Sequence, residues 1–371
     1  MRSLQIEWHL THKLGLLRDL RELCPNLHEI NLRGLRSEPF SVVDLYGIIA
    51  SLDNLEIIEI SETGLFLFTI LPMRTRLKFL HLTCYPGDEF LRSGSPPILI
   101  DTRVWPHLTG LSLEIDHHEF VSLFDIPSES FSSRHPSPVQ DFWLKMHDLN
   151  GTFSRPGSPY QIFRVLAEQF TSLHSLAIFL PPAVDHDIPA TFEFKVIRPI
   201  LNLPNITRFM LRDKSHLIMT DADVRSLVAA WPRLEVFWLP NCALDENPRH
   251  LTALTLSSLL IFIDHCPSLR ELRLLVDARI TAAELKPVPG RSFPKAFERL
   301  ILGHSPLPEK LHLVIAFLTF VLPAPRTLSY SGFRLRGHGR SKNHRRWNRV
   351  RNVLNRVWRV RRSTGISVQC M

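Results

Sequence analysis

The chain has 371 residues, of which 44% are hydrophobic and 22% charged, proportions that are ordinary for a soluble protein. Its formal charge of +8 is concentrated at one end. From Ser331 onward there are 12 Lys and Arg residues and no acidic residue, whereas the first 330 residues hold 32 basic and 36 acidic side chains. The five cysteines include no C-x-x-C pair, which argues against a disulfide framework and indicates a reducing compartment.

No targeting or membrane segment is predicted. The first residues lack the continuous apolar core of a signal peptide. The apolar run at Leu311–Leu322 is 12 residues long, below the roughly 20 that a helix needs to span a bilayer. We therefore expect a soluble protein of the cytoplasm, the nucleus or both, with no membrane partner.

An L-x-x-L-x-L pattern recurs along the chain. Its clearest copy is Trp231–Leu244, where Leu234, Phe237 and Leu239 occupy the three apolar positions. We call the first apolar position the anchor of a copy, and count the other positions from it. Anchors fall at Leu27, Leu55, Leu77, Leu108, Val139, Leu173, Ile206, Leu234, Leu269 and Phe297, with weaker copies at Met1 and Pro325. The spacing is 22 to 35 residues and averages about 29, which is the upper edge of the range for leucine-rich repeats.

Several copies also share a lead-in, which is harder to obtain by chance than recurring leucines. The lead-ins are C-P-N-L at Cys24, W-P-H-L at Trp105, L-P-N-I at Leu203, W-P-R-L at Trp231 and C-P-S-L at Cys266. The pattern resembles that of leucine-rich repeats, in which each unit buries its apolar stripe only by stacking on its neighbours.

The predicted fold is an α/β leucine-rich-repeat solenoid over residues 1–330, with about 10 to 12 irregular repeats. Each L-x-x-L-x-L segment is predicted to be a strand, and some segments between the strands have apolar residues at helical spacing. These segments are 220–230, 251–263 and 308–322. Strand followed by helix predicts a curved parallel sheet lined by helices. Three Pro- and Ser-rich segments, 85–97, 116–138 and 151–159, are predicted as loop insertions.

The basic end, residues 331–371, is predicted as a capping helix and tail. Trp347, Val350, Leu354, Val357 and Trp358 recur at helical spacing within 343–362, as expected for a helix that covers the last apolar edge of a solenoid. A second interpretation is that the arginines bind nucleic acid or direct nuclear import. The candidate residues are Arg345, Arg346, Arg349 and Arg351.

The sequence offers no catalytic motif. Glycine-rich phosphate loops, G-x-S-x-G and H-E-x-x-H are all absent from it. The clusters 116–119 (D-H-H-E) and 185–187 (D-H-D) are better explained as solvated loops, because neighbouring side chains on a strand point to opposite sides. We therefore predict no enzyme activity, no metal and no cofactor.

If the chain binds a protein, the concave face of the sheet is the expected place, where positions +2, +4 and +6 alternate away from the core. The +4 row is polar at first and largely apolar from Trp143 onward. The candidate partner-binding residues are Trp143, Phe179, Arg208, Met210, Arg212, Trp238 and Arg273. Trp and Met flanked by Arg are typical of protein-binding hot spots. The alternative is that these side chains stack on one another or are covered by a loop or the tail.

The repeats, with their W-P-R-L and C-P-S-L lead-ins and irregular Pro- and Ser-rich loops, resemble the repeat half of fungal F-box proteins over essentially the whole chain. In that family a helical F-box docks an adaptor of a cullin ubiquitin ligase, and the repeats select the substrate. No L-P-x-E-[LI]-x-x-x-I-F-like segment precedes Leu27. The resemblance thus implies a substrate-recognition module without its adaptor-docking half, from either a truncated coding region or a repeat-only relative.

Overall fold

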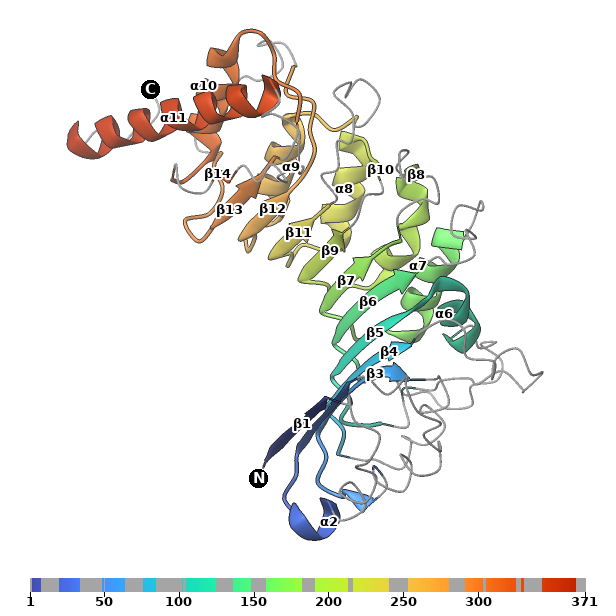
Figure 1. Cartoon of the computed structure of the whole chain (residues 1–371). Coiled ribbons are helices and arrows are strands. Elements are labelled where there is room, and N and C mark those ends of the chain that lie inside the picture. The colour runs from blue at the N-terminus through green and yellow to red at the C-terminus, as the bar shows by residue number, and fades with distance from the viewer. Residues whose placement is uncertain are drawn as a thin grey trace. The chain divides into compact units, whose positions relative to one another are not determined.

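The structure is a computed structural model of the chain (Figure 1). It describes residues 2–7, 20–33, 49, 51–63, 76–84, 102, 105–124, 136–147, 158–181, 191–212, 216–239, 253–279, 291–302, 305–324, 328–329 and 342–364. The chain divides into two compact units, Met1–Pro181 and Pro182–Met371. Each unit is described by itself.

The first unit contains parallel strands that pair in chain order. They are β1 (Ser3–Glu7), β2 (Glu29–Arg33), β3 (Ile57–Thr63), β4 (Phe79–Cys84), β5 (Gly110–Asp116), β6 (Asp141–His147) and β7 (Ser175–Phe179). Its helices are α2 (Leu20–Leu23), α6 (His117–Phe124) and α7 (Ser158–Gln169). Each of these strands begins two residues after the anchor predicted for it.

The second unit repeats this arrangement. Its parallel strands are β9 (Arg208–Arg212), β11 (Val236–Trp238), β12 (Glu271–Arg273), β13 (Arg299–Ile301) and β14 (Leu328–Ser329), and a separate parallel pair is formed by β8 (Thr191–Glu193) and β10 (His216–Ile218). The helices are α8 (Asp221–Ala230), α9 (Ser257–His265), α10 (Leu311–Val321) and α11 (Lys342–Thr364), with 3-10 turns η5 (Phe194–Val196) and η6 (Arg198–Asn202). Helices α8 and α9 pack together on one side of the strands (Figure 1).

The core consists of the three apolar positions of each copy. In the ten copies from Leu27 to Phe297, none of these positions is more than 4% exposed. Neighbouring strands pair them at equal positions, as in Ile30 with Ile58 and Phe237 with Leu272. The predicted α/β leucine-rich-repeat fold is therefore confirmed by the register of the strands.

The lead-in motif has a structural explanation. At Trp231 the backbone N–H donates to the carbonyl of Leu227 (3.0 Å), which closes helix α8, and the Trp231 carbonyl accepts from the N–H of the anchor Leu234 (3.1 Å). Cys266 does the same after α9, with similar backbone angles. The proline that follows suits the second position of such a turn and disfavours a helical conformation in the residue before it. One buried residue thus ends a helix and begins the turn into the next strand.

A second set of hydrogen bonds fixes the register between copies. At nine of the anchors, namely Met1, Leu27, Leu55, Leu77, Leu108, Val139, Ile206, Leu234 and Leu269, the carbonyl of the following residue accepts two consecutive N–H groups from the next copy. Thr207 accepts from Glu235 (2.7 Å) and Val236 (3.1 Å), and Gln140 accepts from His174 and Ser175 at 2.8 and 3.0 Å. The strands joined in this way are therefore aligned at their first residues.

The helix predicted at 220–230 is confirmed as α8. Thr220 caps it in a capping box with Asp223, and Val224, Leu227 and Val228 are buried, as their spacing predicts. The carboxylate of Asp221 then joins this helix to the next copy, because it accepts from the N–H (3.0 Å) and hydroxyl (2.6 Å) of Thr255. It also accepts from the hydroxyl of the fully buried Ser258.

The loop predicted at 116–138 is partly wrong. Asp116 ends β5, and the next eight residues form α6, in which Phe120, Leu123 and Phe124 are buried at helical spacing. The signal was missed because the apolar positions cover barely two turns between a charged D-H-H-E start and a Ser- and Pro-rich continuation. Of the other predicted insertions, 85–97 lies outside the described residues, and 151–159 is described only from Ser158, where α7 begins.

The basic end forms helix α11, which packs on α10. Trp347, Val350 and Leu354 are at most 1% exposed, and the Trp347 Nε1–H donates to the carbonyl of Ser305 (2.8 Å). Arg346 donates to the carbonyls of Leu307 (3.0 Å) and Pro308. The helix thus belongs to the second compact unit. The division of the chain at residue 330 remains a prediction.

We predict that Trp347→Ala destabilises the end of the second unit by about 3 to 5 kcal/mol, since it removes a fully buried indole and a buried hydrogen bond. Amide hydrogen exchange in α10 and α11 should accelerate accordingly. Val360→Ala in the same helix is the matched control, because Val360 is 60% exposed and its loss should change the free energy by less than about 0.5 kcal/mol. Equal protection in the two variants would contradict this assignment.

Candidate binding face on the strands

The face of the strands opposite the core carries the candidate residues, and we call it the open strand face. In the first unit the +4 row runs in register through Gln5, Asn31, Glu59, His81, Ser112, Trp143 and Ala177. In the second unit it runs through Met210, Trp238, Arg273, Ile301 and Ser329. The alignment of this row, expected from the sequence, is therefore present within each unit.

The seven candidate residues fall into two groups. Trp143 and Phe179 lie in the first unit, whereas Arg208, Met210, Arg212, Trp238 and Arg273 lie in the second. We call the first group, together with His81, the aromatic patch, and the second the basic–aromatic patch. Each is treated as a separate candidate.

The aromatic patch is a stack of rings across neighbouring strands. The ring centroids of Trp143 and Phe179 are 5.0 Å apart with a tilt of 51°, and those of His81 and Trp143 are 6.1 Å apart. All three side chains are half-buried. Contacts between rings at these distances stabilise the rings in one orientation. Stacking, the alternative considered from the sequence, is therefore present in this patch, and part of each ring stays exposed.

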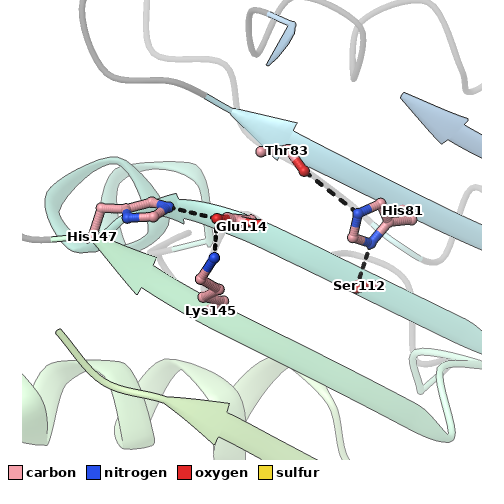
Figure 2. Close-up of polar contacts among 6 residues, drawn as sticks. All are labelled: His81, Thr83, Ser112, Glu114, Lys145 and His147. Atoms are coloured by element: carbon pink, nitrogen blue, oxygen red, sulfur yellow. Dashed lines mark hydrogen bonds and ion pairs between the residues drawn. The ribbon is translucent and has the colours of Figure 1, made fainter. Parts of the chain in front are cut away.

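Polar side chains of β4, β5 and β6 form two sets of contacts on these strands, one around Glu114 and one around His81 of the aromatic patch (Figure 2). The carboxylate of Glu114 accepts from Lys145 Nζ and is 2.9 Å from His147 Nε2. The His81 ring lies between two hydroxyls, with Nδ1 2.6 Å from Ser112 Oγ and Nε2 3.4 Å from Thr83 Oγ1 (Figure 2).

Sequence reasoning did not identify these polar contacts as a site. Those that cross between strands join residues 31 to 33 positions apart. These positions lie side by side because β4, β5 and β6 each begin two residues after their anchors, whatever the length of the connections between the strands. The signal that could have found them is the count from the anchors, which places Glu114 and Lys145 at the same +6 position.

Burial lowers the pKa of His81 below its ordinary value of 6.5, because the charged imidazolium loses solvation. The carboxylates of Glu59 and Glu114 act in the opposite direction, and Arg33 adds to the lowering. The neutral ring favoured by this balance has one N–H donor and one acceptor nitrogen, which match the two neighbouring hydroxyls.

The basic–aromatic patch is built around Trp238. The guanidinium of Arg212 lies 4.7 Å from the centre of the Trp238 ring, a cation–π geometry. Met210 and Arg273 pair with Trp238 from the strands on either side, and all four side chains are half-buried. The indole Nε1–H of Trp238 is buried and has no hydrogen-bond partner among the described residues.

The charges around this patch are predominantly positive. Arg208 is exposed at the edge of β9. Glu271 lies in the same +2 row of the second unit as Arg208. Its carboxylate forms an ion pair with the guanidinium of Arg299, with 3.6 Å between Oε2 and Nη1. The patch therefore presents an indole and a thioether beside the guanidinium groups of Arg208, Arg212 and Arg273.

The four basic-tail candidates do not share one surface. Arg345 and Arg349 are exposed on α11, Arg351 is half-buried, and Arg346 donates to backbone carbonyls as described above. Arg346 therefore has a structural contact that its charge alone did not indicate.

Within the described ranges, no group of three or more His, Cys, Asp or Glu side chains is placed to hold a metal ion. The 185–187 cluster lies outside those ranges. Among the helices that the structure describes, none is long and apolar enough to cross a membrane.

Comparison with known proteins adds two structural neighbours. The leucine-rich repeat-containing protein LegL7 of Legionella pneumophila is 12% identical, with a TM-score of 0.41, over 94% of this chain and 98% of that one. An internalin (inlF) of Listeria monocytogenes is 12% identical, with a TM-score of 0.33, over 90% of this chain and 83% of that one. No protein-family model matches the chain, and neither does any curated protein.

Because both TM-scores are below 0.5, these neighbours carry no argument about function. The fold follows from the repeats of the chain itself: ten copies of one apolar pattern, from Leu27 to Phe297, each provide a parallel strand with its core positions buried. The chain therefore has an α/β leucine-rich-repeat fold, with the +4 row on the strand face opposite the core.

We predict that the stability of the first unit falls as His81 becomes protonated. Its pKa is lowered in the folded state, so the unfolded state binds this proton first as the pH falls below 6.5. The stabilising contribution is complete above pH 6.5 and is lost as the pH falls through the folded-state pKa. The free energy of unfolding, measured from pH 7.5 to 5, should therefore decline less in His81→Gln than in the wild type. Equal declines would rule out His81 as the group responsible.

Proposed function

We propose that this chain is a non-enzymatic scaffold that binds another protein through its open strand face, with Trp238 as the principal anchor. The observation that carries the proposal is the environment of Trp238. It is a half-buried indole, fixed by Arg212 on its ring and flanked in register by Met210 and Arg273. Trp and Arg are the residues most enriched at binding hot spots.

The contact between Arg212 and Trp238 supports this role. A side chain already held in one orientation loses less conformational entropy when a partner binds, so more of the contact energy remains as affinity. The stacking alternative and the binding proposal are thus compatible, because stacking fixes the ring and leaves part of it exposed. The same argument applies to Trp143, which Phe179 fixes in the aromatic patch.

The charge of the basic–aromatic patch indicates the kind of partner. Arg208, Arg212 and Arg273 surround an apolar centre, which suits a partner segment with acidic residues on either side of a large apolar residue. Arginine is suited to this role, since its planar guanidinium both stacks on rings and binds carboxylates with two donors.

We predict that partners bound at the basic–aromatic patch are lost from affinity capture with Trp238→Ala, and that partners bound at the aromatic patch are lost with Trp143→Ala. Removal of a central indole from a hot spot costs about 2 to 4 kcal/mol of binding, or about 30- to 1000-fold in affinity. Tyr160→Ala is the matched control, because Tyr160 is 44% exposed on helix α7 and lies off the strand face. Recovery of the same partners by both Trp variants at wild-type levels would contradict the proposal.

In its finer form, the proposal is that the scaffold is a substrate-recognition module related to F-box receptors of cullin ubiquitin ligases. The support is the resemblance of the W-P-R-L and C-P-S-L lead-ins and irregular Pro- and Ser-rich loops to the repeat half of those proteins. Its place of action would then be the cytoplasm, the nucleus or both.

We predict that this chain alone recovers no ligase adaptor or cullin subunit, whereas a fusion with an F-box at its N-terminus recovers both. Quantitative mass spectrometry of the two captures provides the measurement. Recovery of both subunits by the chain alone would contradict this prediction. Loss of the strand-face partners in the fusion would show that the two functions do not combine.

A further inference from the structure

One side of helix α11 carries an exposed row of arginines. Arg345, Arg349, Arg356 and Arg359 are all exposed, and two more exposed residues, Asn352 and Ser363, continue the same row. From Arg345 to Ser363 the successive spacings are 4, 3, 4, 3 and 4 residues, which place all six on one face of an α-helix. We call Arg345, Arg349, Arg356 and Arg359 the arginine row.

The opposite side of α11 is anchored to the second unit. Trp347, Val350 and Leu354 are buried, and Arg346 binds the carbonyls of Leu307 and Pro308 just before α10. The arginine row is therefore presented by a fixed helix. This side of the helix is exposed because the apolar contacts and Arg346 hold the other side against the protein.

No acidic residue of the helix neutralises the positive charge of the row. Helix α11 contains no Asp or Glu, and within the described part of the chain none of the four arginines forms an ion pair with a carboxylate. Arg359 lies 14 positions after Arg345, which corresponds to about 21 Å along a helix axis. This is a linear, rigid row of positive charge.

We propose that the arginine row binds the phosphate backbone of a nucleic-acid duplex, independently of base sequence. A duplex presents closely spaced phosphates along a rigid line, with one charge per about 1.7 Å of axis in DNA, so several arginines can pair at once. Guanidinium groups pair with phosphates whatever the base sequence, so the row by itself would confer no sequence preference.

The composition of the row argues against a membrane surface. Helices that bind membranes insert a continuous apolar face beside their basic residues. Here the apolar face of α11 is occupied by the protein, and the positions interspersed in the row are Asn352 and Ser363. Among the described side chains of α11, Val360 is the one large apolar group that is mostly exposed.

This binding is independent of the strand-face proposal. The arginine row lies on α11, and the proposed anchors Trp143 and Trp238 lie on β6 and β11. Failure of one proposal therefore leaves the other intact, and Trp238→Ala is expected to keep full affinity for nucleic acid.

The test uses the full chain and a DNA duplex of about 20 base pairs, roughly two helical turns, in two unrelated sequences. The variant Arg345→Gln, Arg349→Gln, Arg356→Gln and Arg359→Gln removes the row. A control variant removes the same number of positive charges from exposed positions elsewhere in the second unit. Its substitutions are Arg225→Gln, Arg233→Gln, Arg270→Gln and Lys295→Gln. Circular dichroism spectra like that of the wild type would show that both variants are folded.

Four phosphate contacts predict a slope of about −3.6 for the logarithm of affinity against the logarithm of salt concentration, or about a hundredfold loss from 50 to 200 mM. The wild type and the control variant should show this dependence with both sequences, and the row variant should lose it. An RNA duplex of equal length, as a parallel arm, tells which duplex binds more tightly.

Four outcomes would overturn the proposal. The first is absence of binding by the wild type, and the second is equal weakening in the row and control variants, which would reflect net charge alone. The third is tighter binding of a single strand of the same length than of the duplex. The fourth is retention on anionic lipid vesicles that the row variant loses, which would assign the row to a membrane.

Discussion

The rest of the structure depends on how each strand begins. At nine of the anchors the carbonyl of the following residue accepts two N–H groups from the next copy, and at Trp231 and Cys266 the residue before the lead-in proline joins the end of a helix to the turn. These hydrogen bonds join backbone groups, so they define the register of the strands without any side chain. Because side chains alternate along a strand, a slip of one residue would exchange the core with the open face. The buried leucines and the +4 row of side chains on the opposite face are therefore consequences of the same backbone constraint.

Those parts of the fold that depend on local spacing were predictable from the sequence. The apolar pattern located the strands, and the caps of α8 announced its start at Thr220. Helix α6 was missed because its apolar signal is short and its flanks resemble a loop. The bonds of Arg346 to Leu307 and Pro308 were missed because a charged side chain in a basic segment gives no sign of a carbonyl partner nearly forty residues away.

The candidate site also has one property that the sequence predicted and another that it did not. The +4 row could be written from the anchors alone, because the copies are aligned at the start of every strand. The exposure and partners of each side chain could not, since these depend on neighbours contributed by other copies. Glu114 is an example: its contacts with Lys145 and His147 exist because β5 and β6 are in register over seven residue pairs. The repeat pattern of the sequence therefore predicts where a side chain lies, whereas its contacts depend on the neighbouring copies.

The constant offset between anchor and strand also affects how such a chain can change over time. Intervals between anchors range from 22 to 35 residues, yet the strands paired from β1 to β7 all begin two residues after their anchors. Insertions and deletions in the connections therefore leave the register of the row intact. Each strand can exchange its outward residue without changing the backbone register of the next, so the side chains of the binding face can change one strand at a time while the backbone stays the same.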